Sequence, residues 1–165
     1  MLTTEIPSQE HASLDQYPVA DLVATLIDDQ FNAVAAARQS GAAIVAVVEA
    51  AVPRIAAGGR LIYVGAGTSG RLGVLDGVEL HPTFSWPHER ALSLLAGGKG
   101  AMFLAVEGAE DDAGQGAADL AALRPGPDDV VLLLAASGAT PYVLGALEAA
   151  HGSGALTVGI ANNPG

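Results

Sequence analysis

Two short turns rich in glycine and hydroxyl residues, each directly after an apolar run, most constrain what this chain can fold into. The first, Gly65–Gly70 (GAGTSG), follows Leu61–Val64, and the second, Ala136–Pro141 (ASGATP), follows Val130–Leu134. Each pattern predicts a strand, a tight turn and a helix. Glycine lets backbone N–H groups crowd toward an anion, and the following helix directs its positive end to the same place. Together with the hydroxyls, each turn is a candidate phosphate cradle.

The remaining pattern alternates helices with strands. Helical spacing of apolar residues runs from Val19, and a second helix is expected after Ser40. Strands are expected at residues 60–64, 92–95, 130–134 and 157–160, with helices starting near Ser69, at Asp111 or Asp112, and after Pro141. Residues 79–87 are expected to be irregular and residues 99–106 to form a short helix. We therefore predict an α/β fold, a parallel sheet flanked by helices in flavodoxin-like layers, with an N-terminal helical extension.

This order also predicts the domain organisation. Residues 1–57 are expected to form an N-terminal arm and helices, and residues 58–165 a sugar-phosphate-binding domain. In a parallel sheet, ligands bind beyond the carboxyl ends of the strands, where both glycine turns fall. Two cradles in one sheet favour a phosphosugar over a dinucleotide.

Composition excludes several classes of function. The 165 residues include 7 basic and 18 acidic side chains, for a net charge of −11, so no nucleic-acid partner is expected. There is no cysteine, and the four histidines lack metal-ligand spacing, so no metal is expected. The N-terminus does not read as a signal peptide, and no uncharged apolar stretch reaches bilayer-spanning length, which favours the cytoplasm and no membrane partner.

The first turn also fits the G-x-G-x-x-G pattern of dinucleotide sites. Such sites place an acid after the second strand, but Ala96-Gly97-Gly98 stands there. The alternative is a purely structural role, in which these glycines only allow a tight turn and Ser137–Pro141 is an ordinary helix N-cap. Neither turn is a Walker A loop, because the lysine is missing.

Two glutamates lie near these turns in the sequence. Glu79 follows the first helix start, and Glu110 lies in an acidic run, Glu107–Asp112. Acidic runs are most often solvated helix starts. Spacing alone leaves Glu110 a surface residue and does not bring the two carboxylates together.

The motifs taken together resemble one family. Arg60–Asp76 looks like the corresponding stretch of the N-acetylmuramic acid 6-phosphate etherases, which have the sugar isomerase (SIS) fold and are related to glucokinase regulatory protein. The resemblance extends to Pro82–Phe84, Ala96–Gly98, Ala105–Asp112, Ala136–Val143 and Asn163–Gly165. It covers nearly the whole chain, but the family's further strand and C-terminal helices are absent, so the chain looks C-terminally truncated.

The resemblance implies a cofactor-free lyase that removes the D-lactyl ether from a phosphorylated amino sugar, in the cytoplasm and as a homodimer. Glu79 is then the acid that protonates the departing lactyl oxygen, and Glu110 the second catalytic group, a base. The substrate phosphate is assigned to both turns, at Gly67, Thr68, Ser69, Gly70, Ser137, Gly138 and Thr140.

Departures from the family pattern keep two other functions open. Ala139 stands where the family usually has arginine, and Val78, Leu80 and His81 replace the usual neighbours of the catalytic glutamate. A non-catalytic phosphosugar-binding regulatory module is one alternative. An aldose–ketose isomerase, which shares proton abstraction at C2, is the other.

Overall fold

The computed structural model describes residue 4 and residues 6–163, and its centre is a four-stranded parallel sheet. The strands are β1 (Leu61–Gly65), β2 (Ala91–Leu95), β3 (Val130–Leu134) and β4 (Leu156–Ile160), in the spatial order β2-β1-β3-β4. In the strand register, Gly65 pairs with both Leu95 and Leu134. The tips of β1, β2 and β3 therefore end level at one edge, and this edge carries both glycine turns.

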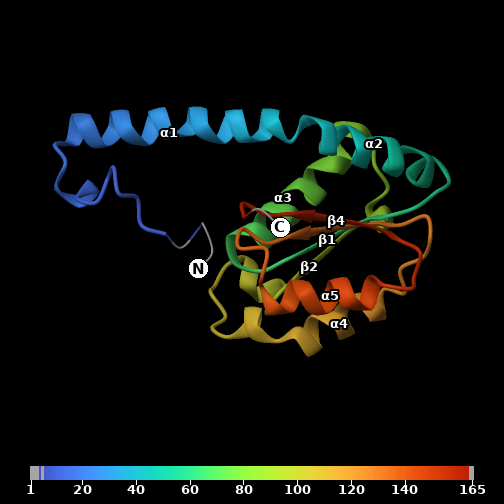
Figure 1. Cartoon of the computed structure of the whole chain (residues 1–165). Coiled ribbons are helices and arrows are strands. Elements are labelled where there is room, and N and C mark those ends of the chain that lie inside the picture. Colours follow the sequence, from blue (N-terminus) through green and yellow to red (C-terminus); the bar gives the residue numbers. More distant parts are fainter. Residues whose placement is uncertain (1–3, 5, 164–165) are drawn as a thin grey trace.

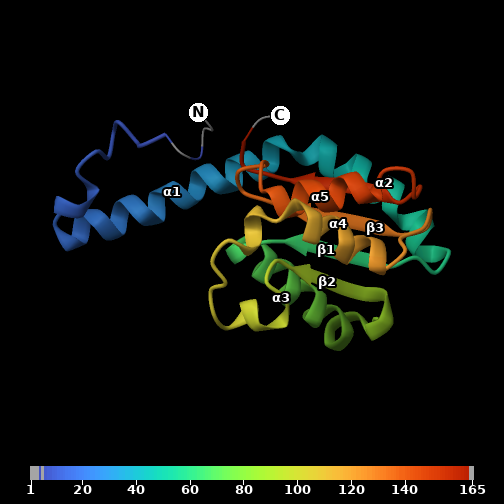
Figure 2. The same cartoon turned by 90° about the horizontal axis from the view of Figure 1, so that it is seen from below.

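The described residues also form five α-helices. They are α1 (Val19–Gln39), α2 (Gly41–Ala56), α3 (Gly67–Phe84), α4 (Ala113–Ala122) and α5 (Pro141–Ala150). Short 3-10 turns occur at η2 (Leu14–Gln16), η3 (His88–Arg90), η4 (Lys99–Met102) and η5 (Ala109–Asp111). Helices α4 and α5 cover one face of the sheet and α2 and α3 the other, while α1 projects away from it (Figures 1 and 2). The predicted α/β layering is confirmed.

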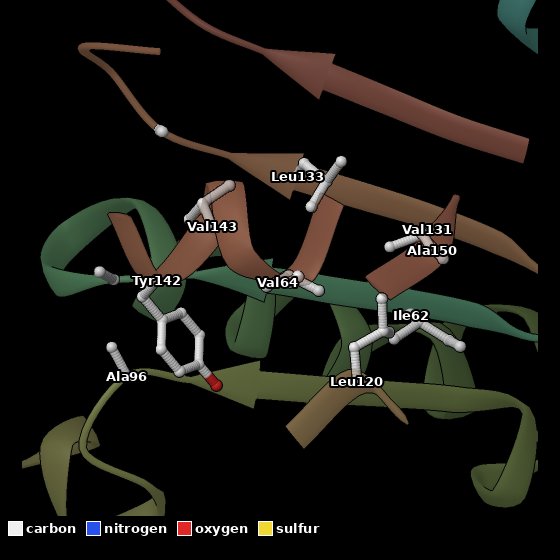
Figure 3. Close-up of a cluster of buried hydrophobic side chains, with 12 residues drawn as sticks. Ile62, Val64, Ala96, Leu120, Val131, Leu133, Tyr142, Val143 and Ala150 are labelled. Carbon is white, nitrogen blue, oxygen red and sulfur yellow. The ribbon is translucent and has the colours of Figure 1, made fainter. Parts of the chain in front are cut away.

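The core lies between the sheet and the α4–α5 layer (Figure 3). Ile62, Leu120 and Tyr142 are fully buried there. The two helices touch through glycine, because a Cβ at Gly116 or Gly145 would lie 1.9 Å from a backbone oxygen of the other helix. This close contact holds the start of α5, and with it the second glycine turn, against the sheet.

An ion pair closes the opposite edge of the sheet. Arg60 Nη2 lies 2.6 Å from Asp129 Oδ2, and the Asp129 carboxylate also accepts the amide protons of Arg60 and Gly126. Burial by itself raises the pKa of Asp129. The hydrogen bonds and the charge of Arg60 outweigh burial, so the net pKa lies below the ordinary value. The pair ties the starts of β1 and β3 together.

Two local expectations need correction. Residues 79–84 are helical rather than irregular: α3 runs through Pro82, near its last turn, and ends at Phe84, followed by Ser85, whose φ of 53° is left-handed. Residues 99–106 form only the 3-10 turn η4, because Phe103 and Leu104 are 86% and 75% exposed and have no core to pack against.

Helices α1 and α2 contain no buried residue. Apolar side chains are exposed along both, at Val19, Val23, Leu26, Ile27, Phe31, Val34, Ile44, Val45, Val48 and Val52. We call these residues the α1–α2 apolar face. No single helix in the described part of the chain is long and apolar enough to cross a membrane; α1 and α2 taken together pass on length and composition, but they bend by 53° where they meet.

Candidate functional site

The first turn is built by the close approach of α3 to the tip of β1. A Cβ at Gly65 would lie 2.6 Å from Gly70 Cα, so both positions require glycine for this contact. Gly67 has a φ of 53°, which a residue without Cβ adopts most easily. The first helical bond runs from the amide of Gly70 to the carbonyl of Ala66. The amides of the preceding residues lie at the helix N-terminus, where they have no partner within the helix.

Helix α3 is also anchored further along. The Tyr63 hydroxyl on β1 donates to Asp76 Oδ2 at 2.6 Å, and burial together with this bond raises the pKa of Tyr63. Thr68 is exposed and Ser69 half-buried, so both hydroxyls remain near the surface of the turn. The sequence therefore places a fixed helix end, with free amides and hydroxyls, at the tip of β1.

The second turn lies beside the first, because β1 and β3 are neighbours. Gly138 has a φ of 72°, the Ala139 amide donates to Ser137 Oγ at 3.1 Å, and Ser137 Oγ lies 3.5 Å from Thr140 Oγ1. Asn163 Nδ2 donates to the carbonyl of Ser137 at 2.9 Å. Thr140 occupies the N-cap position of α5 but makes no side-chain capping bond. Its hydroxyl is thus not committed to the helix end.

Asn163 also reaches the N-terminal arm. Its Nδ2 donates to Thr4 Oγ1 at 2.9 Å, and the Thr4 amide donates to its Oδ1 at 3.1 Å. The N-terminal arm and the end of the chain thus meet at the second turn. Pro164 and Gly165, which belong to the family-like segment Asn163–Gly165, lie outside the described residues.

Each turn borders its own cavity. A cavity of about 230 Å³, here the Gly67 pocket, lies between Ala66, Gly67 and Arg71 on one side and Ala96, Ala101 and residues 105–110 on the other. A cavity of about 520 Å³, here the Ser137 pocket, is lined by Ser137, Gly138 and residues of β3, α5 and β4. Thr68, Ser69, Gly70 and Thr140 line neither. The structure thus places the two turns side by side without joining them in one cavity.

The two glutamates are not brought together within one chain. Glu110, in η5, lines the Gly67 pocket and is exposed. Glu79 is exposed on α3, twelve residues after Gly67, so it lies about 18 Å further along the helix axis. It shares the outer face of α3 with Leu72 and Leu75, which are 58% and 52% exposed.

Arg71 is a site residue that the sequence reasoning missed. It lines the Gly67 pocket, and its guanidinium Nε donates to the carbonyl of Ala101, another lining residue, at 2.9 Å. The signal was present in the sequence: Arg71 follows Gly67 by four residues, so its side chain stands one helical turn from the glycine. Arg71 therefore adds a cationic side chain to the lining of this pocket.

The combination of groups suits a sugar bearing anionic substituents. Helix ends and hydroxyls bind a phosphate, a guanidinium binds a second anion, and a carboxylate in the same pocket can move a proton. Within residue 4 and residues 6–163, no group of three or more histidine, aspartate or glutamate side chains is placed to hold a metal ion.

Comparisons with known proteins show which proteins this chain is similar to. Residues 43–151 match the model of the glucokinase regulatory protein N-terminal SIS domain. The chain is 56% identical over 162 residues to an N-acetylmuramic acid 6-phosphate etherase of Deinococcus radiodurans, covering 98% of this chain and 53% of that protein. It is 52% identical over 163 residues to the etherase of Cutibacterium acnes, covering 99% and 54% respectively.

The chain thus spans about half the length of the curated relatives it matches. The matched model covers both glycine turns, the Gly67 pocket and the two glutamates. The chain therefore belongs to the family of the glucokinase regulatory protein N-terminal SIS domain, and within it resembles the N-acetylmuramic acid 6-phosphate etherases.

Proposed function

We propose that this chain provides the phosphosugar-binding and proton-transfer groups of an N-acetylmuramic acid 6-phosphate etherase. The observation that carries the proposal is the Gly67 pocket, which is lined by the N-terminus of α3, by Arg71 and by Glu110. The names of the similar proteins support the same substrate. We assign the phosphate to the amides and hydroxyls of the turns at Gly67–Gly70 and at Ser137, Gly138 and Thr140.

The chemistry follows from these groups. Opening of the sugar ring gives an aldehyde at C1, which makes the proton on C2 acidic. Glu110 removes that proton, the C3–O bond breaks, and the lactyl oxygen leaves with a proton from an acid, which we assign to Glu79. Water then adds to the C2=C3 double bond, its hydroxyl to C3 and a proton to C2. The products are D-lactate and N-acetylglucosamine 6-phosphate. One glutamate must start ionised and the other protonated, which needs different surroundings.

The separation of Glu79 from Glu110 favours a site shared between two copies of the chain. Glu79 lies on an outer face of α3 that also carries exposed leucines, and the α1–α2 apolar face is uncovered. Exposed apolar surface of this extent is typical of protein–protein contacts. We propose a homodimer in which residues 1–57 form much of the contact and residues 58–165 bind the sugar, so that Glu79 of one copy serves the Glu110 pocket of the other.

Release of lactate tests the proposal directly. The protein is incubated with N-acetylmuramic acid 6-phosphate in ¹⁸O-labelled water, and free lactate and the mass of the sugar product are measured. An etherase releases lactate and places one labelled oxygen at C3. Glu110→Gln and Glu79→Gln are each expected to lower the rate about 10²- to 10⁴-fold. Glu148→Gln, an exposed glutamate on α5, serves as the matched control.

The same experiment separates the alternatives. Binding of the sugar phosphate without lactate release supports a regulatory module. Ketose formation without ether cleavage supports an isomerase. Lactate release that survives in both glutamate variants would contradict the assignment of Glu79 and Glu110. Under the etherase proposal the protein acts in the cytoplasm, in recycling of cell-wall amino sugars.

A further inference from the structure

Arg71 is held in a fixed place at the wall of the Gly67 pocket. It extends from the second turn of α3 and lines the cavity, and its Nε donates to the carbonyl of Ala101 in η4 at 2.9 Å. No acceptor in the described part of the chain receives a bond from its two Nη groups. One edge of the guanidinium is thus anchored to the protein, and the Nη groups remain available to a ligand.

The charges around the pocket show why a cation is needed there. Glu107 and Glu110 line the same cavity, and the whole chain has a net charge of −11. An anion entering this pocket meets two carboxylates. Arg71 is the basic residue among those that line it, and within the described residues it forms no ion pair with a carboxylate. Its charge is therefore not neutralised by the protein before a ligand binds.

Two different anions of the proposed substrate need two different sites. The phosphate is on C6, and helix-end amides with hydroxyls at the turns provide for it. The lactyl carboxylate is attached through the oxygen on C3, next to the C2 proton that Glu110 removes. Because C2 and C3 are bonded neighbours, the lactyl group must enter the same pocket as Glu110, and Arg71 lines that pocket. A planar guanidinium with two free Nη groups matches a carboxylate.

We propose that Arg71 binds the carboxylate of the lactyl group and so makes the site select the ether-bearing sugar phosphate over its product. This inference rests on the proposed function, since it takes N-acetylmuramic acid 6-phosphate as the ligand. It assigns Arg71 a role in substrate specificity rather than in the proton transfers. The product, N-acetylglucosamine 6-phosphate, lacks the carboxylate and leaves Arg71 without a partner.

The test compares two ligands that differ by the lactyl group. Binding of N-acetylmuramic acid 6-phosphate and of N-acetylglucosamine 6-phosphate is measured by calorimetry, with the first ligand followed under conditions or in a Glu110→Gln background where it is not consumed. Arg71→Gln is expected to weaken binding of the first about 10- to 100-fold and of the second less than about threefold. Arg71→Lys keeps the charge but not the planar guanidinium, so its affinity for N-acetylmuramic acid 6-phosphate is expected to lie between those of the wild type and of Arg71→Gln.

The matched control is Arg124→Gln. Arg124 is exposed between α4 and β3, at the edge of the sheet opposite the glycine turns, and its removal should leave both affinities unchanged. Thermal unfolding of each variant detects any loss of fold from removing the bond to Ala101.

The outcomes are distinguishable. Equal loss for both ligands in Arg71→Gln overturns the assignment, because Arg71 then holds the phosphate or the fold. No loss for either overturns it as well. Wild-type protein that binds neither sugar phosphate overturns both the proposed function and this inference. Selective loss without lactate release by the wild type supports the role of Arg71 in binding while contradicting the etherase activity.

Discussion

Replacing Gly70 with alanine tests whether the first turn depends on the close approach of α3 to β1. A Cβ at this position would lie 2.5 Å from Leu95 Cδ1 and 2.6 Å from the carbonyl carbon of Gly65. The Leu95 side chain can rotate away. The backbone of Gly65 lies within the sheet and cannot move as easily. The helix must therefore move outward by about 0.8 Å, so that the distance from the new Cβ to the Gly65 carbonyl carbon increases from 2.6 Å to the 3.4 Å of an ordinary contact.

Overpacking of this kind costs about 2–3 kcal/mol, which for a chain of this size lowers the melting temperature by about 4–12 °C. Thermal unfolding followed by circular dichroism measures the change, and calorimetry with a sugar phosphate reports whether the displaced amides still bind. We expect the affinity to fall together with the stability, because the same helix end forms both the contact and the cradle.

Gly67→Ala is the matched control. A Cβ at Gly67 has nothing within 4 Å, so only its φ of 53° opposes the substitution, at about 1 kcal/mol. A double variant, Gly70→Ala with Leu95→Ala, shows whether the new Cβ clashes with the backbone of Gly65 or with the Leu95 side chain. If the clash is with the backbone, the losses of unfolding free energy in the two single variants add in the double variant. The reasoning is refuted if Gly70→Ala is no more destabilising than Gly67→Ala.

Three further predictions concern stability and assembly. Because the pKa of Asp129 is lowered on folding, its pair with Arg60 stabilises the protein above about pH 4, and this contribution is lost as pH falls through the folded pKa. Asp129→Asn should lower the free energy of unfolding by about 3 kcal/mol at pH 7. The variant's midpoint of urea unfolding should also change less with pH in the acid range than that of the wild type. Phe31→Ser on the α1–α2 apolar face should lower the mass measured by light scattering while changing monomer stability by less than about 0.5 kcal/mol; an unchanged dimer would place the contact elsewhere. In Gly145→Ala the new Cβ would lie 1.9 Å from the Ala113 carbonyl oxygen, so the variant should lose about 3 kcal/mol or more of unfolding free energy, measured by thermal unfolding. A loss near zero would contradict the close packing of α4 against α5.

Local patterns were enough to predict the sheet and its layers. The apolar runs at Leu61–Val64 and Val130–Leu134 are strands because they are buried. The second glycine segment is a turn, but in the first only Ala66 separates β1 from α3, so the helix begins at Gly67 rather than near Ser69. Pro82 misled the prediction, since a proline near a helix end removes a bond that the helix can lose without stopping. Residues 99–106 fall short of a helix because only Ala101 in this segment is buried, whereas Phe103 and Leu104 are exposed, and this burial is decided by the tertiary structure.

The candidate site was predictable only in part. Both turns lie at the expected edge, but sequence spacing gives no information on which loop folds over which turn. Glu110 lines the Gly67 pocket because residues 105–110 and the start of α3 border the same cavity, and this arrangement depends on the whole path of residues 96–112. Arg71 was not among the predicted site residues, because the prediction considered the glycine segment Gly65–Gly70 alone and not the part of α3 that follows it.

The contact between Thr4 and Asn163 has a consequence for how the chain opens and closes. It joins residues 159 positions apart through two solvent-exposed hydrogen bonds, each worth about 1 kcal/mol or less. Because the partners of Thr4 are exposed and lie just beyond β3 and β4, we expect this contact to open by local unfolding while the sheet stays intact. In hydrogen–deuterium exchange, the amide of Thr4 should therefore exchange by local opening, orders of magnitude faster than the amides of β1, so that its protection tracks the arm alone.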